Sequence, residues 1–206
     1  RAYGIAKSTD RGASWTSINT GLTNVSVSLL SVPSTPGSDT VYATAVSGEG
    51  TFRSTDGGET WENILEGGIT HPWADELRVN PADEADVWEV ADVSEVFRSL
   101  DHGDTWRKVI NPYGSGFRFG SVYALAPAPS DPDIIYALKN GFGIFRTRDG
   151  GRNWSFLHQS EVDYTYTLAV HPSDPNIVFS GYNPKPFQDW AMIRRTTDGG
   201  ESWETV

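Results

Sequence analysis

One motif of eight residues recurs five times along the chain, and this repetition restricts the folds that the chain can adopt. Each copy reads Ser/Thr-x-Asp-x-Gly-x-Ser/Thr/Asn-Trp, and the copies span residues 8–15, 54–61, 99–106, 147–154 and 196–203. Successive aspartates lie 46, 45, 48 and 49 residues apart. A nearly constant period of this length is typical of a chain built from similar structural units that pack side by side.

The motif resembles the Asp-box, also called the BNR repeat, and the resemblance covers nearly the whole chain. In that family the box is the turn between the third and fourth strands of a β-propeller blade. The resemblance implies that the box aspartate ties down the backbone of the turn and that the tryptophan packs into the blade. The residues with these structural roles are Asp10, Trp15, Asp56, Trp61, Asp101, Trp106, Asp149, Trp154, Asp198 and Trp203.

The residue types of the motif support a structural role independently of the resemblance. An aspartate side chain in a turn can accept hydrogen bonds from backbone amides two or three residues further on. The shared glycines stand where a tight hairpin needs a positive φ, and they are Gly12, Gly58, Gly103, Gly151 and Gly200. A single active site has no use for five copies of its catalytic group, so we expect architecture rather than chemistry from the boxes.

The rest of each period fits four short strands. In residues 121–158, for example, we expect strands at 121–127, 133–138, 144–147 and 153–157, with the box between the last two. The predicted fold is therefore all-β, a β-propeller of four-stranded antiparallel blades with an Asp-box turn between strands 3 and 4 of each blade. We expect one propeller segment over 1–206, with the outer half of a blade at 1–20 and one blade each at 21–66, 67–111, 112–159 and 160–206.

About four and a half blades are present by this count. Propellers that the sequence resembles usually close with six or more blades, and an open ring exposes unpaired strand edges. We therefore expect the chain to be part of a larger ring, with the remaining blades supplied by missing sequence or by another chain. The alternative is an unusually small closed ring whose first blade lacks two inner strands.

Composition limits the classes of partner and of site. The 206 residues include 16 basic and 27 acidic side chains, for a net charge of −11, and such a surface repels nucleic acid and anionic membranes. The absence of cysteine excludes disulfides, thiolate catalysis and thiolate metal ligands. The histidines, which are His71, His102, His158 and His171, lack the spacing of zinc ligands. We expect no metal, no cofactor, no nucleic-acid partner and no membrane partner.

Loops on the face opposite the boxes are the place to look for a ligand site, because functional residues concentrate on irregular loops over a rigid scaffold. Trp88 falls in a second strand, and we expect it in the core. The aromatic residues that fall in the opposite loops are Trp73, Tyr113, Phe117, Phe119, Tyr164 and Trp190. Such aromatics suit stacking on a carbohydrate or a protein contact. The alternative is that they pack the loops on one another or plug the channel.

Acidic residues collect in the same loops, namely Asp75, Glu76, Asp92, Glu95, Glu161, Asp163 and Asp189. The segment around Asp92 resembles the stretch of xyloglucanases in which an Asp-x-Gly-Gly turn carries a catalytic aspartate. The resemblance implies that Asp92 is a candidate acid or base, although Ser94 and Glu95 replace the two glycines and those enzymes place their two carboxylates on facing propellers.

The sialidase pattern of convergent arginines is not evident in the sequence. The four arginines that occupy one repeat position are Arg53, Arg98, Arg146 and Arg195. Because they recur with the blades, we expect them on the outer-strand surface rather than in an anion clamp.

Three functions fit these observations. The first is a non-catalytic module that binds a protein or a polysaccharide through the face opposite the boxes, as sortilin-type and photosystem-assembly propellers imply. The second is a glycoside hydrolase of xyloglucanase type that acts on β-glucan polysaccharide, so the sequence leaves open whether the protein is an enzyme. The third is a structural spacer in an extracellular assembly. We expect a secreted or cell-surface protein.

Overall fold

The computed structural model describes residues 4–23, 25–33, 35–45, 50–64, 74–91, 95–110, 122–139, 143–158, 164–183 and 192–206. These residues form β-strands and no helix. Accordingly, the described part of the chain contains no helix long and apolar enough to span a membrane.

The strands form one short hairpin and four sheets of four strands, and all neighbouring strands are antiparallel. The hairpin consists of β1 (Ala6–Lys7) and β2 (Thr16–Ser17). The first sheet consists of β3 (Val27–Ser31), β4 (Val41–Ala45), β5 (Thr51–Ser54) and β6 (Glu62–Asn63). The second consists of β7 (Ala74–Asn80), β8 (Asp83–Ala91), β9 (Glu95–Ser99) and β10 (Arg107–Ile110). The third consists of β11 (Val122–Ala128), β12 (Asp131–Lys139), β13 (Gly143–Thr147) and β14 (Ser155–His158). The fourth consists of β15 (Tyr164–Val170), β16 (Val178–Asn183), β17 (Met192–Thr196) and β18 (Glu204–Thr205).

The predicted all-β fold is confirmed, and in each four-stranded sheet the box joins the third strand to the fourth. The strands expected in residues 121–158 correspond to β11, β12, β13 and β14. The turn before β12 is shorter than expected, because β11 and β12 continue to a closing pair of Ala128 and Asp131 after a register shift at Pro127.

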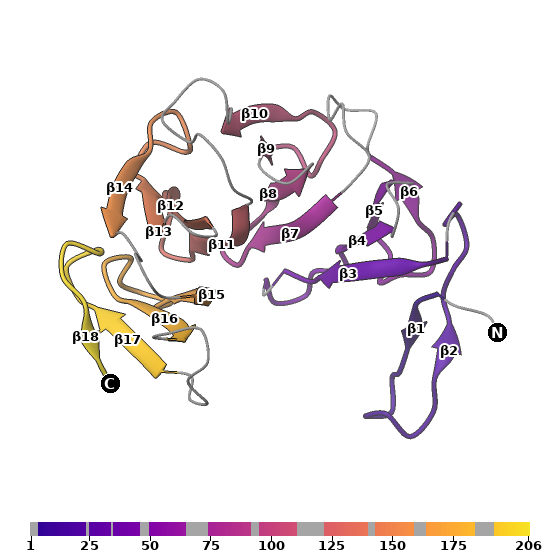
Figure 1. Ribbon diagram of the computed structural model, residues 1–206. Helices are drawn as coiled ribbons and strands as arrows, with labels where there is room; N and C mark the ends of the chain where they lie inside the picture. The colour runs from indigo at the N-terminus through magenta and orange to yellow at the C-terminus, as the bar shows by residue number, and fades with distance from the viewer. Residues whose placement is uncertain are drawn as a thin grey trace.

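The sheets follow one another along an arc, with the β1–β2 hairpin at one end and the β15–β18 sheet at the other (Figure 1). The first strands of successive sheets are in contact, β3 with β7, β7 with β11 and β11 with β15. Each first strand therefore lies on the inner side of the arc, and the fourth strands lie on the outer side (Figure 1).

The two ends of the strands define two faces. On one face, the box backbone bonds to the turn before the second strand of its own sheet, or to the start of that strand, as where Gly57 N donates to Asp39 O at 2.7 Å. The same bond recurs from His102 to Ala85, from Gly150 to Asp133 and from Gly199 to Asn176. We call this the box face. At the opposite face, Ala91 at the end of β8 pairs both with Ala74 of β7 and with Glu95 of β9.

Most of the core lies between neighbouring sheets, so a central strand is buried on both sides. Ile135 of β12 packs in one cluster with Trp88 of the second sheet, and the adjacent Tyr136 packs in another with Val178 of the fourth. Successive side chains of a strand point to opposite faces, so alternate residues serve two different junctions. This explains why residues 134–138 form a continuous apolar run. The expectation that Trp88 is a core residue is confirmed, since it is fully buried.

The box tryptophans provide a matched test of this packing. Trp61 is 5% exposed and contacts the hairpin, where its Nε1 donates to Ile18 O at 2.8 Å. Trp15 occupies the same position of the first box but is 66% exposed. We expect Trp61→Ala to lower the free energy of unfolding by about 3–5 kcal/mol, as for other large core truncations. Trp15→Ala should change it by less than about 0.5 kcal/mol. Denaturant unfolding of both variants measures the difference, and equal losses would contradict the assignment of the tryptophan to the inter-sheet core.

Candidate functional site

Each box is a closed network of hydrogen bonds around its aspartate. In the second box, Asp56 Oδ1 accepts from the hydroxyl of Ser54 at 2.7 Å and from the amide of Thr60 at 2.9 Å. Asp56 Oδ2 accepts from the Thr60 hydroxyl at 2.5 Å, and Ser54 Oγ accepts from the amide of Gly58 at 2.8 Å. The amide that the aspartate binds is therefore four residues further on, rather than the expected two or three. The glycine has a φ of 94°, which a residue with a Cβ rarely adopts.

The other four boxes have the same bonds, centred on Asp10, Asp101, Asp149 and Asp198. Hydrogen bonds to the charged carboxylate favour the ionised form. The hydroxyl and amide of Thr60 lower the pKa of Asp56 to about 2, and those of Ser14 do the same for Asp10. A carboxylate whose two oxygens are held in this way serves the turn, and it is a poor proton donor near neutral pH.

A cation immediately before each of the first four boxes reaches the box of the next sheet. Arg53 Nη1 donates to the carbonyl of His102, the residue after the aspartate of the next box, at 2.9 Å. The same bond runs from Lys7 to Gly57, from Arg98 to Gly150 and from Arg146 to Gly199. We call this contact the inter-sheet cation bond. It links the hairpin and the four sheets in chain order.

The placement of the repeated arginines on the outer surface is wrong for three of the four. The side chains of Arg53, Arg98 and Arg146 are 12%, 5% and 8% exposed. They point at the neighbouring sheet, where a long side chain with several donors can satisfy turn carbonyls that the packing removes from water. Arg195 is 41% exposed and bonds to Glu204 of its own sheet.

The cation bond is most elaborate at Arg98. Its Nε and Nη2 donate to the two oxygens of Asp86 at 2.7 and 3.1 Å, and this aspartate is fully buried. Nη2 also donates to Pro132 O at 2.9 Å, and the guanidinium lies over the Trp88 ring at 4.7 Å from its centroid. Two-point pairing with a carboxylate fixes the orientation of the guanidinium as well as its position.

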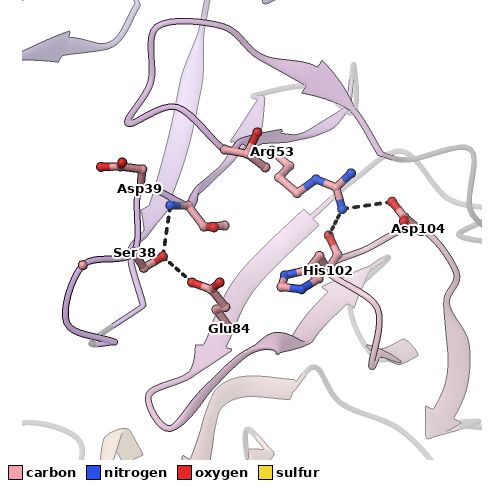
Figure 2. A pocket seen from close by; sticks show the side chains of 9 residues that line it. Ser38, Asp39, Arg53, Glu84, His102 and Asp104 are labelled. Atoms are coloured by element: carbon pink, nitrogen blue, oxygen red, sulfur yellow. Dashed lines mark hydrogen bonds and ion pairs between the residues drawn. The ribbon is translucent and has the colours of Figure 1, made fainter.

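A polar pocket of about 600 Å³ lies on the box face between the first two sheets. Figure 2 shows that Arg53 crosses it to the backbone of His102 and to Asp104 at 2.9 Å, while Ser38 bonds to Glu84 on the other side. The arginine also contacts Glu62, so carboxylates and a carbonyl already occupy its donors. The pocket is thus built around an inter-sheet cation bond and has no free anion clamp.

The residues chosen for the ligand site fall mostly outside the described residues, namely Trp73, Asp92, Tyr113, Phe117, Phe119 and Trp190. Tyr164 opens β15, where its backbone pairs with Asn183. The described strand ends next to these residues lie at the opposite face. Ala74, which follows Trp73, is the register partner of Ala91, which precedes Asp92. The site residues therefore stay a prediction, but the points of attachment of Trp73 and Asp92 are neighbours.

Two of the acids expected near that face take part in packing. Glu76 is 6% exposed, accepts from the amide of Leu125 in the next sheet at 2.8 Å and pairs with Arg78. Burial raises the pKa of Glu76 to about 7 against the lowering effects of Arg78 and the Leu125 amide. Glu95 pairs with Lys108 at 2.5 Å. Asp75, Asp92, Glu161, Asp163 and Asp189 are acids whose side chains are outside what the structure describes.

Another buried acid, Glu89, is not evident from the sequence pattern. It is fully buried in β8, and its Oε2 accepts from the hydroxyl of Thr51 in the first sheet at 2.9 Å. Its Oε1 has no hydrogen-bond partner in the described part of the chain. Burial raises the pKa of Glu89 to about 8, with the Thr51 bond acting in the opposite direction. The side chain is therefore largely protonated at neutral pH.

The repeat itself carried a signal for this pair. Aligned by the register with the third strand, the position of Glu89 holds Ala43, Ala137 and Ser180 in the other sheets. The position of Thr51 holds Val96, Ile144 and Ile193. At the junction of the first two sheets, a buried hydroxyl–carboxyl bond therefore stands in place of an apolar contact. The two polar residues, Thr51 and Glu89, occupy the two positions that meet. Among the described residues, no group of three or more acids and histidines is arranged to hold a metal ion.

The comparisons with known proteins agree with this architecture. A family model described as "Sortilin, neurotensin receptor 3" matches residues 94–206, more than half of the chain. The chain belongs to the Sortilin-Vps10 family. The model of the BNR/Asp-box repeat matches residues 52–63, which include the second box. The predicted Asp-box propeller group is confirmed.

Curated and solved relatives extend the comparison. The chain is 26% identical to a xyloglucanase, Xgh74A of Acetivibrio thermocellus, over 82% of the chain, but it spans only 24% of that protein. The structure resembles that of an ancestral GH74 enzyme with a TM-score of 0.75 at 17% identity, over 100% of this chain and 28% of the other. It also resembles YCF48 bound to D1 peptide, with a TM-score of 0.59 at 13% identity, over 98% of this chain and 76% of the other. These likenesses establish the β-propeller fold.

Removal of Arg98 should be far more costly than removal of its counterpart in the fourth sheet. Arg98→Leu leaves Asp86 buried without its cation, and we expect a loss of about 3–5 kcal/mol in the free energy of unfolding. Arg195→Leu removes an exposed ion pair, for which about 1 kcal/mol or less is expected. Chemical denaturation of the two variants gives the comparison. Similar losses from both would refute a special role for the inter-sheet cation bond.

Glu89 predicts a pH dependence of stability. Above its ordinary pKa of about 4.5 the unfolded chain has lost this proton, whereas the native state keeps it up to about pH 8. The native state binds more protons in that window, so stability falls as pH rises, by on the order of 1 kcal/mol per pH unit. Glu89→Gln, which can still accept from Thr51, should flatten this slope and be the more stable protein at pH 8. Glu62→Gln, at a side chain 57% exposed, is the control and should follow the wild type in unfolding measured from pH 4.5 to 8.5.

Proposed function

We propose that the protein is a non-catalytic Asp-box propeller module that binds a protein or a glycan through the face opposite the boxes. The observation that carries the proposal is the strand register. Ala74, Ala91 and Glu95 are paired in one row at that face, and the segments that hold the aromatic candidates are attached to such strand ends. The box face is instead covered by repeated turns whose polar groups bond to one another.

The placement of the described acids favours binding over catalysis. Glycoside hydrolysis needs two carboxyl groups that flank one bond, about 5–5.5 Å or 6.5–9.5 Å apart. The box aspartates are held in their turns, and Glu76 and Glu89 are buried between sheets. An aromatic surface with acids at its margin suits a sugar or protein ligand without any bond being broken. We place this activity outside the cell, by analogy with the extracellular relatives of the fold.

A second candidate function is hydrolysis of a β-glucan. The specific observation in its favour is the similarity to the xyloglucanase, which covers 82% of this chain. Asp92 is then the acid or base, and Trp73, Tyr113 and Trp190 are sugar platforms. The chain spans about a quarter of that relative, so the activity of the whole relative is a proposal for this chain.

The binding proposal predicts that aromatic truncations weaken ligand binding without unfolding the protein. The probes are a panel of xyloglucan and other β-glucan oligosaccharides on an array, and a peptide array, both read with the purified chain. Trp73→Ala and Trp190→Ala should each reduce binding at least tenfold, about the loss of one stacking contact. Phe156→Ala is the matched control, because this aromatic is 50% exposed on the outer strand β14. Equal losses in the control would count against the opposite face.

The two functions are separated by an assay of reducing-end release from xyloglucan. Turnover by the wild type that is lost in Asp92→Asn would favour the hydrolase and overturn the binding proposal. Binding without turnover, unchanged in Asp92→Asn, would support the binding module.

A further inference from the structure

The junction of the first two sheets is fixed at its box-face end by polar bonds. Arg53 donates to the carbonyl of His102 at 2.9 Å and pairs with Asp104. The Tyr42 hydroxyl donates to Glu84 O at 3.0 Å. Arginine and tyrosine ionise far above neutral pH, and burial raises the pKa of Tyr42 further. These two donors therefore keep their protons, and their bonds, throughout the range from pH 5 to 9.

The other end of this junction, toward the opposite face, depends on an acid. Thr51 begins β5, and its hydroxyl donates to Glu89 Oε2 at 2.9 Å. Glu89 lies two residues before Ala91, which pairs with Ala74 and Glu95 at the opposite face. Thr51 and Glu89 are both fully buried. The two sheets thus meet here through one hydroxyl and one carboxyl group that are removed from solvent.

The interface accepts Glu89 as a neutral acid and not as a carboxylate. Its Oε1 has no hydrogen-bond partner in the described part of the chain. Burial raises the pKa of Glu89 to about 8, and the bond from Thr51 opposes this effect only in part. An ionised Glu89 would be a buried charge without a cation, which is among the most costly groups in a protein interior.

The surrounding strands offer no charge that would stabilise the carboxylate. Each described side chain that is charged or titratable and faces this junction already bonds elsewhere, Arg53 and Tyr42 as above, Glu62 with Arg53, and Glu95 with Lys108. Glu89 is therefore free to respond to pH without a partner that would hold its charge in place.

The two junctions that follow have no ionisable group at these positions. Val96 and Ala137 share one apolar cluster at the next junction. Ile144 and Ser180 hold the same positions at the junction of the third and fourth sheets, as the register shows. A change in the charge of Glu89 therefore acts on one junction only, and the bonds at the box face make that end of it the hinge.

We propose that the junction of the first two sheets is a proton-operated gate, which opens at the opposite face when Glu89 loses its proton and turns about the bonds of Arg53 and Tyr42. Opening separates the start of β5 from the end of β8, where Ala91 lies. The consequence for a ligand at that face rests on the proposed function, because a site that spans both sheets would be pulled apart.

The direction of the effect follows from the protons bound in each state. In the open junction Glu89 meets water and is ionised above its ordinary pKa of about 4.5, whereas in the closed junction it stays protonated up to about pH 8. Opening therefore releases one proton in this window, so the ratio of open to closed molecules rises about tenfold per pH unit. Above pH 8 the two states bind equal numbers of protons and the ratio becomes constant.

The absence of cysteine from the chain allows a single thiol to report on one junction. Thr44→Cys is the probe, because Thr44 is fully buried and is the register partner of Thr51. Leu138→Cys is the matched control, because Leu138 pairs with Ile144 at the equivalent position and packs against the fourth sheet. Each is made with and without Glu89→Gln, which stays uncharged at every pH.

The rate of labelling by a thiol reagent is measured from pH 6 to pH 9. Dividing the rate without Glu89→Gln by the rate with it removes the ionisation of the thiol itself, which is common to both. We expect this quotient to rise about tenfold per pH unit up to pH 8 in the Thr44→Cys chain and to level off above it. In the Leu138→Cys chain it should stay constant.

A constant quotient in the Thr44→Cys chain would overturn the gate. An equal rise in both chains would also overturn it, because it would show unfolding of the whole chain instead of one junction. Hydrogen exchange of the wild type and of Glu89→Gln is a second readout that needs no cysteine. Residues 51–54 should lose protection between pH 6 and pH 8 in the wild type alone, after correction for intrinsic exchange, whereas residues 143–147 should not.

The link to the ligand face is tested with a xyloglucan oligosaccharide at pH 6.5 and pH 8.5. We expect at least a tenfold loss of affinity at the higher pH in the wild type and no loss in Glu89→Gln. Equal affinity of the wild type at both pH values would refute the link. Absence of binding at both would count against the proposed function for this ligand, whereas labelling and hydrogen exchange decide the gate without any ligand.

Discussion

The bond from a buried cation to a turn carbonyl of the next sheet is the contact on which the order of the sheets depends. Apolar packing between sheets is not directional, so by itself it would tolerate small slips of one sheet past another. The cation bond adds a fixed point at the rim of each junction. It also explains the role of the aspartate network within each box. This network holds the turn in the shape that presents the carbonyl to Arg53 or its equivalents.

The two faces of the molecule therefore differ in the polar groups that they offer to a ligand. On the box face, serine, threonine and aspartate side chains bond within the turn, and arginines bond across the junctions, so few polar groups remain for a ligand. The opposite face carries the ends of paired strands, such as Ala74, Ala91 and Glu95. The ligand site that we propose for that face would have a rigid base, because the strands beneath it are paired in register.

The pair of Thr51 and Glu89 shows what the scaffold tolerates. A buried carboxyl replaces a small apolar residue at one junction, and the facing aliphatic residue has become a hydroxyl that donates to it. The two residues form one hydrogen bond, but the acid is buried in the interface between the sheets. This burial raises the pKa of Glu89. Stability at this junction is therefore linked to pH, whereas the next junction, where Val96 and Ala137 share one apolar cluster, has no such group at these positions.

The sequence by itself determined the repeat, the four strands of each unit and the turn role of the boxes, because these depend on contacts within one repeat unit. It placed Arg53 and its equivalents on the surface and overlooked Glu89, since each acts on a residue of another sheet. Arg53 and His102 are 49 positions apart, and Thr51 and Glu89 are 38 apart. Which side of a strand meets the next sheet is decided only when the sheets pack, because alternation along a strand defines two faces without saying what covers them.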